Sequence, residues 1–222
     1  MKRAVREICF VAAGIAGLSL TGAALADNIT LYNTGADAGG LVAPGAANTP
    51  WTVSPAGVGD GTSRVISAGN RYSGWIPNSA ISQWIGTADV SNTGPVGSYS
   101  FDQRFDLTGL VASTATIGGR WAGDDLLIDI RINGVSVGTD GIGGAAVGAG
   151  TSWTDWHAFN IAANNAAFTN GINTISLVIQ NSDNFLEGVR VELSGTARAI
   201  PAPSVFVPLA LAGLIAARRR RA

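Results

Sequence analysis

The strongest constraint on this chain is an alternation of apolar and polar residues between residues 98 and 196. The run Leu126–Ile132 is apolar at every second position and ends at Asn133-Gly134, a pair that favours a tight hairpin because both residues must accept positive φ. A period of two is typical of antiparallel strands with one buried face. We therefore predict an all-β fold, an antiparallel sandwich or jelly roll. Similar runs cover residues 99–107, 117–121, 135–137, 159–161, 175–179 and 189–193.

The part of the chain before residue 98 has weaker strand signals. An opening strand is expected over residues 29–32. Gly138–Gly150 is rich in glycine and alanine and predicts a flexible loop. There is no clear linker or internal repeat, so residues 27–199 are predicted to form one domain. Short strands between Gly- and Pro-rich loops are expected at residues 51–53, 64–66 and 84–85.

The first 26 residues predict a signal peptide. A basic start is followed by a short apolar run and by small residues at Ala24 and Ala26, the order that signal peptidase requires. We expect cleavage after Ala26. A retained membrane anchor is the alternative, but the apolar run is shorter than the roughly 20 residues that span a bilayer.

The C-terminal segment carries a second export signal. Pro201-Ala202-Pro203 precedes 13 uncharged residues, 205–217, and the chain then has a cluster of four arginines. As a helix, the apolar segment would be about 20 Å long, against a hydrocarbon core of about 30 Å. Basic residues are retained on the cytoplasmic side of the inner membrane. The cluster comprises Arg218, Arg219, Arg220 and Arg221.

This arrangement resembles the PEP-CTERM sorting signal, with Ala202 at the position where glutamate is usual. The resemblance implies transient insertion of a C-terminal helix into the inner membrane of a Gram-negative bacterium. It further implies cleavage near the proline box by an exosortase-like membrane protease, and delivery to the cell surface or the extracellular matrix of a biofilm. An uncut tail anchor is the alternative.

Four segments of the domain are similar to the β-sandwich found in many PEP-CTERM proteins, which itself resembles the galactose-binding-like jelly roll. That fold includes many carbohydrate-binding modules, but a fold does not determine a function. The similarity implies the fold class only. Its segments are Phe105–Gly109, Gly119–Ala122, Ile132–Gly134 and Val191–Thr196.

Charge and cysteine content exclude several classes of function. Three of the 14 basic residues lie in the signal peptide and four in the tail, whereas only one of the 15 acidic residues, Glu7, lies outside the domain. The domain is therefore near −7 and contains no lysine, which argues against a nucleic-acid partner. It also has no cysteine, which excludes disulfides and thiolate chemistry. No cofactor is expected.

Tryptophans and a pair of acids are the candidate ligand-binding residues. Trp121 is in phase with Ile117 and is expected in the core. The other candidates lie in loops or at strand ends, where an exposed indole face can stack on a sugar ring. Their alternative is also core packing. These predicted residues are Trp75, Trp84, Trp153 and Trp156.

Asp124 and Asp125 form a predicted turn that could bind sugar hydroxyls or help to hold a structural Ca²⁺, which prefers oxygen ligands. An ordinary solvated acidic turn is the alternative. Glu192 and Asp155 are further candidate oxygen ligands, although no EF-hand loop exists. The single histidine, His157, has no partner histidine for a zinc site and is interpreted as a polar residue at a strand end.

Three hypotheses follow from the sequence. The first is a non-catalytic exported protein that associates with extracellular polysaccharide. The second is a purely structural or self-associating surface protein. The third is a glycan-active enzyme, although no residue stands out as catalytic and no carboxylate pair is singled out.

Overall fold

The computed structural model describes residues 25–54, 61–90, 94, 96–141, 143–144, 152–183 and 185–201. Most of the predicted signal peptide and nearly all of the sorting tail, including Ala202, Pro203 and the arginine cluster, lie outside the described residues. Within the described part of the chain, no helix is both long enough and apolar enough to cross a membrane.

The described residues form an all-β, antiparallel fold, as predicted. One long sheet curls on itself, and a two-stranded hairpin stands beside it. The strands are β1 (Ala26–Asn28), β2 (Ala36–Asp37), β3 (Gly40–Leu41), β4 (Ala47–Ser54), β5 (Thr62–Val65), β6 (Ile85–Gly86), β7 (Gly97–Asp106), β8 (Thr116–Asp124), β9 (Leu126–Ile132), β10 (Val135–Ser136), β11 (His157–Ile161), β12 (Ile172–Asn181) and β13 (Gly188–Arg198).

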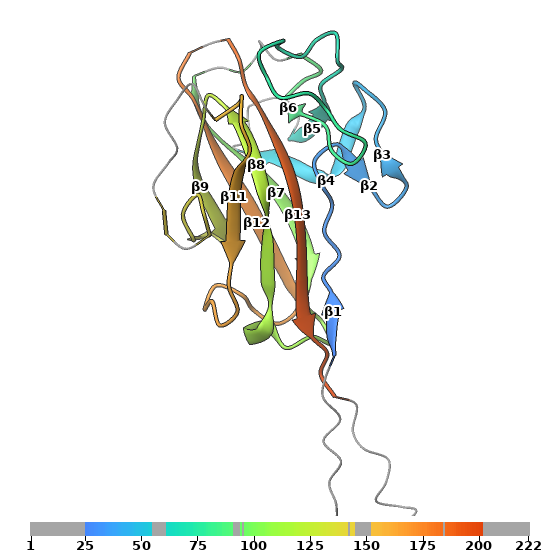
Figure 1. Ribbon diagram of the computed structural model, residues 1–222, viewed down its shortest axis with the longest axis vertical. Coiled ribbons are helices and arrows are strands. Elements are labelled where there is room, and N and C mark those ends of the chain that lie inside the picture. Colours follow the sequence, from blue (N-terminus) through green and yellow to red (C-terminus); the bar gives the residue numbers. More distant parts are fainter. Residues whose placement is uncertain are drawn as a thin grey trace, which may run out of the picture.

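The strand order of the curled sheet is β10-β9-β12-β7-β4-β5-β6-β13-β8-β11. Its two ends become the layers of a sandwich: β11, β8 and β13 lie in front of β9, β12 and β7 in Figure 1. The short strands β5 and β6 carry the sheet from one layer to the other at the upper end of the molecule. The hydrogen-bonded path therefore runs continuously from one layer into the other.

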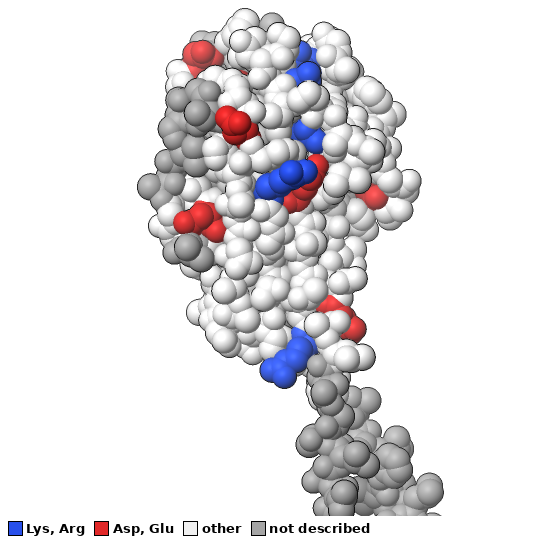
Figure 2. All heavy atoms as spheres, viewed as in Figure 1, with Lys and Arg blue, Asp and Glu red and all other residues white. Residues whose placement is uncertain are grey.

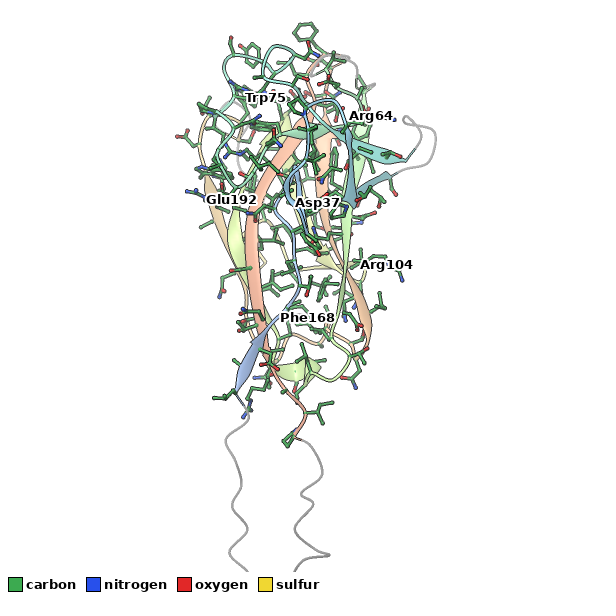
Figure 3. The ribbon with its side chains drawn as sticks, turned by 90° about the vertical axis from the view of Figure 1, so that its right-hand side faces the viewer. Asp37, Arg64, Trp75, Arg104, Phe168 and Glu192 are labelled. Atoms are coloured by element: carbon green, nitrogen blue, oxygen red, sulfur yellow. The ribbon has the colours of Figure 1, made fainter. Side chains whose placement is uncertain are left out.

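Alternate residues of the long strands face the core between the layers. Trp51, Phe101, Trp121 and Leu127 are completely buried in it, which confirms the core position predicted for Trp121. The Trp121 indole N–H donates to the carbonyl oxygen of Thr139 at 2.9 Å, so its one polar group is satisfied. Phe168, labelled in Figure 3, closes the lower end of the core against Phe105.

The predicted opening strand over residues 29–32 is wrong, because the first strand is β1, which begins at Ala26. β1 pairs with the end of β13, and Ile29 N–H still donates to the carbonyl of Gly195. The segment 29–34 stays beside β13, where the Thr34 N–H donates to the Val191 carbonyl at 3.1 Å, and it also contacts β7 of the other layer. There the Tyr32 N–H donates to Gln103 Oε1 at 2.9 Å, and Gln103 Nε2 donates back to the Tyr32 carbonyl at 2.8 Å. This segment thus links β13 to β7 without being a strand.

The other predicted strands are present with modest changes in their bounds. The short signals at residues 51–53, 64–66 and 84–85 correspond to β4, β5 and β6. Asn133 and Gly134 both have positive φ, and they join β9 to β10 as predicted. The predicted loop Gly138–Gly150 lies partly outside the described residues, so its flexibility stays a prediction.

Gly119 of β8 permits a close approach of β13. A Cβ at this position would lie 2.1 Å from the carbonyl oxygen of Glu192 and 2.9 Å from Leu193 Cα, both backbone atoms of the paired strand. A Cβ at Gly69, by contrast, would meet no atom within 4 Å.

We expect Gly119→Ala to lower the free energy of unfolding by roughly 1–3 kcal/mol or more, because the paired backbone must move. Gly69→Ala should change it by less than about 0.5 kcal/mol. Chemical denaturation of both variants would measure this difference. Equal stabilities would show that the β8–β13 contact is not tight.

Candidate functional site

The upper half of the outer face of the β8–β13 layer is covered by loops. Trp75 and Trp84 stack with their ring centroids 4.1 Å apart and pack with Ile66 on Ala122 of β8. Gly188 of β13 makes room for this contact, since a Cβ there would lie 2.7 Å from Trp75. The Trp75–Trp84 cluster is therefore a second small core outside the sandwich. Figure 3 shows Trp75 near the upper end of the molecule.

This second core contradicts the sugar-stacking prediction for two tryptophans. Trp75 is 2% exposed and Trp84 is fully buried, so neither offers an indole face to a ligand. Their N–H groups are also satisfied within the protein, by Asp124 and by the Ile76 carbonyl. The core-packing alternative holds for both residues, because loops cover positions that the sequence pattern places outside the strands.

Asp124 anchors the second core to β8. The Trp75 indole N–H donates to Asp124 Oδ2 at 2.5 Å, and Asp124 is only 1% exposed. Its other oxygen, Oδ1, has no hydrogen-bond partner among the described residues. Burial raises the pKa of Asp124 to about 7, against the effect of the Trp75 hydrogen bond, and the negative charges of Asp125 and Asp183 add to the rise. Asp124 is therefore neither the exposed ligand-binding residue that was predicted nor the solvated turn residue of the alternative.

Asp125 is half-buried and holds a neighbouring loop. Its Oδ2 accepts hydrogen bonds from the backbone N–H and the hydroxyl of Ser182, at 2.6 and 2.5 Å. The two predicted ligand-binding carboxylates therefore make different internal contacts, and neither faces the open sheet. In the described ranges, no three Asp, Glu, His or Cys side chains are grouped so that they could hold a metal ion.

Below the second core, the outer face of the same layer is open and forms a groove of about 420 Å³. Its floor carries small side chains or none, because β8 contributes Gly118 and Gly119 and β11 contributes Ala158. A ligand can therefore approach the sheet backbone closely. The walls are Asn33, Ile81, Arg120, Glu192, Leu193 and Ser194.

An ion pair fixes the upper wall of the groove. Arg120 and Glu192 face each other across β8 and β13, and both Nε and Nη2 of Arg120 donate to Glu192 Oε2, at 2.8 and 2.6 Å. Ser82 donates to the other carboxylate oxygen at 2.7 Å. Although burial alone would raise it, the hydrogen bonds from Ser82 and Arg120 hold the pKa of Glu192 below its ordinary value. The carboxylate is therefore charged and rigidly placed.

Trp156 lies beside this ion pair and connects it to the second core. Its ring is 4.4 Å from the guanidinium carbon of Arg120 and 4.7 Å from that of Arg190, which are cation–π distances. Arg190 is buried and donates to Ser82 Oγ and to the Pro77 carbonyl. Burial lowers the pKa of Arg190 to about 10, so it stays protonated at neutral pH.

The remaining predicted residues have mixed environments. Trp153 and Trp156 are half-buried and pack against the Trp75–Trp84 cluster. His157 is also half-buried and lies with its ring 4.6 Å from Trp121. Of the predicted tryptophans, Trp156 is the one shown in contact with a groove residue, Arg120.

Sequence reasoning missed most of the groove. Asn33, Ile81 and Gly118 come from three separate segments, and nothing in their local sequence indicates that they meet. One signal was available: Arg190 and Glu192 stand in the outward phase of β13, opposite the apolar core positions. The pairing partner of Glu192, however, depends on the register of β8.

Comparisons with known proteins found solved structures of low similarity to this chain. No protein-family profile matches the chain, and no curated protein matches it. TmCBM61 in complex with β-1,4-galactotriose is 15% identical over 68% of this chain and 93% of its own, with a TM-score of 0.40.

Two further solved structures are similar. A Stig cyclase, Fisc from Fischerella sp. TAU in complex with an indole compound, is 12% identical over 80% of this chain and 100% of its own, with a TM-score of 0.44. The CBM36-1 domain of a multidomain xylanase from the hindgut metagenome of Trinervitermes trinervoides is 17% identical over 64% of this chain and 99% of its own, with a TM-score of 0.29. These values assign neither a ligand nor an activity to this chain.

The buried carboxyl of Asp124 predicts a pH-dependent stability. Its pKa in the folded protein, about 7, lies above the ordinary value of 3.8 for this side chain, so the folded state binds the proton more tightly than the unfolded state. The free energy of unfolding should therefore fall as pH rises from about 4 to 7, by an amount on the order of a few kcal/mol, and level off above that range.

Asp124→Asn keeps an oxygen for the Trp75 indole but does not titrate, so this variant should show a smaller fall over the same pH range. Urea denaturation at a series of pH values measures the slope. Burial also raises the pKa of Glu187, so Glu187 contributes to the same fall in the free energy of unfolding, and this contribution remains in Asp124→Asn. Identical slopes in the parent and the variant would refute the assignment to Asp124.

Proposed function

We propose that this chain is an exported, non-catalytic protein that binds extracellular polysaccharide through the groove on the β8–β13 layer. The observation that carries the proposal is the combination of a floor without bulky side chains and a fixed ion pair on the wall. A sugar chain needs an open surface, and its hydroxyl groups need polar partners that are already held in place. The groove supplies both.

The chemistry of the groove suits a sugar ring. Glu192 can accept hydroxyl hydrogen bonds and Arg120 can donate them, and hydrogen bonds to charged groups are stronger than those between neutral groups. Ile81 is 55% exposed at the side wall and offers an apolar contact for the faces of the ring that carry only C–H groups. Because the ion pair is preorganised, binding costs little side-chain entropy.

A binding role fits the groove better than hydrolysis. Glycosidases generally use two carboxyl groups about 5–10 Å apart, one of them protonated at the start of the reaction. Glu192 is the one acid among the residues that line the groove, and its lowered pKa keeps it ionised. Asp124, the acid with the pKa nearest neutrality, is buried beneath Trp75 and out of reach of a substrate.

Export and sorting form the second part of the proposal. We infer it from the signal-peptide pattern with Ala24 and Ala26, and from the proline box, the uncharged segment and the terminal arginines. Signal peptidase and an exosortase-like protease would be the processing partners. The pairing of β1 with the end of β13 supports a tether of this kind, because it brings both ends of the described domain together at one end of the molecule.

We expect Arg120→Ala to weaken polysaccharide binding by roughly tenfold or more, since a hydrogen bond to a charged group is lost. Affinity gel electrophoresis and calorimetry with a panel of neutral and acidic polysaccharides would measure this effect. Arg131→Ala is the matched control. Arg131 is 45% exposed and pairs with Asp129 at 2.7 Å, whereas Arg120 is 48% exposed and pairs with Glu192 at 2.6 Å, but Arg131 lies on β9 in the other layer.

The control variant should bind like the parent. Both variants should keep the parental unfolding temperature to within a few degrees, since the arginine of each pair is about half exposed to solvent and such a pair contributes about 1 kcal/mol or less. Failure of every polysaccharide to bind the parent protein would remove the binding proposal and leave the structural or self-associating role.

Replacing Arg218–Arg221 with glutamine should impair retention at the inner membrane and cleavage near Pro201, because the basic stop is lost. Mass spectrometry of the mature C-terminus in the native host, combined with cell fractionation, would detect the change. Arg198→Gln, an exposed arginine within the domain, is the control. Processing of the tail variant at the parental site and rate would contradict this sorting mechanism.

A further inference from the structure

Three arginines gather where the groove meets the second core. Arg120 and Arg190 both lie against the ring of Trp156, and the charges of Arg71 and Arg120 both act to lower the pKa of Arg190. In the described part of the chain, Arg71 is held in place by backbone carbonyls, including those of Tyr72 and Trp75, and no acid pairs with it. We call Arg71, Arg120 and Arg190 the arginine cluster.

Among the residues that the structure describes, a single acid forms ion pairs with the arginine cluster. Glu192 is the acid that pairs with it among the described residues, at 2.6 Å from Arg120 and 3.4 Å from Arg190. Three positive charges against one negative charge leave a local excess of two. The excess stands out because the domain as a whole is acidic. Figure 2 shows basic side chains on the upper half of this face, with acidic side chains beside them, above a stretch of the central face without charge.

Arg120 is the member of the cluster that lines the groove. Its side chain is 48% exposed and lines the groove, whereas Arg190 is buried behind Trp156. Nε and Nη2 of Arg120 are used by Glu192, and no residue in the described part of the chain accepts from its third nitrogen, Nη1. Charge that remains in a partly desolvated position interacts more strongly than charge in bulk water.

From this arrangement we propose that the groove selects acidic polysaccharides. A sugar carboxylate binds at Arg120, and the positive charges of the other two arginines of the cluster add to the attraction. The inference rests on the proposed binding function and deepens it. A uronic acid residue is the chemical class that fits, because a guanidinium matches the planar geometry of a carboxylate. The uncharged lower part of the groove would take the neighbouring sugar rings.

The test compares acidic polysaccharides with their own neutral forms, so that linkage and ring type stay constant. The probes are polygalacturonate, alginate and hyaluronate, each with its carboxyl-reduced counterpart, together with neutral galactan and xylan. We expect the full-length protein to bind at least one acidic form roughly tenfold or more tightly than its reduced counterpart, since a charge-assisted contact is lost. Raising NaCl from about 0.05 to 0.5 M should weaken binding of the acidic form and leave the reduced form nearly unchanged.

Arg120→Gln should abolish the difference between the acidic and the reduced form, while Arg131→Gln, the matched pair on β9, should preserve it. Equal binding of both forms by the parent protein, or binding of the neutral polysaccharides alone, would overturn the preference for acidic sugars and leave the proposed binding function standing. Absence of binding to every polysaccharide would instead remove the proposed function itself. A loss of the difference in Arg131→Gln would show that general charge, and not the groove, causes it.

Discussion

Packing of Trp75 and Trp84 onto the outer face of β8 and β13 decides what this layer can do. The small residues Ala122 and Gly188 leave room on this sheet face, and two stacked indoles bury a large apolar area there. The hydrogen bond from Trp75 to Asp124 fixes the cover in one position. Because this cover ends at Trp156, the lower half of the face stays open and becomes the groove.

The groove and its cover share one electrostatic network. Arg190 lies under the cover and Arg120 at the rim of the groove, and the ring of Trp156 touches both guanidinium groups. Burying an arginine is costly unless its donors are satisfied, and Ser82, Pro77 and the neighbouring Glu192 accept them. The same contacts that stabilise the cover thus set the charge that a ligand would meet. Stability and recognition are coupled in this region.

The groove on the β8–β13 layer lies away from both ends of the domain. The segment 29–34 ties β13 to β7 through the paired hydrogen bonds of Tyr32 and Gln103. β1 and the last residues of β13 meet at the lower end in Figure 1, whereas the loop cover lies at the upper end. Arg104, labelled in Figure 3, points away from the sandwich on the β7 side. The groove lies between the two ends, on the β8–β13 layer and not on the layer that contains β7.

The sequence by itself determined the class of fold, most strands and the buried position of Trp121, because a period of two and a turn pair such as Asn133-Gly134 are local signals. It could not place the loop tryptophans, since burial of Trp75 and Trp84 depends on distant residues of β8 and β13. It indicated Asp124 as a possible ligand-binding residue, whereas the tertiary structure buries this carboxyl beneath an indole. Only the register of β8 against β13 brings Arg120 to Glu192, because a shift of one residue would turn every side chain of a strand to the other face.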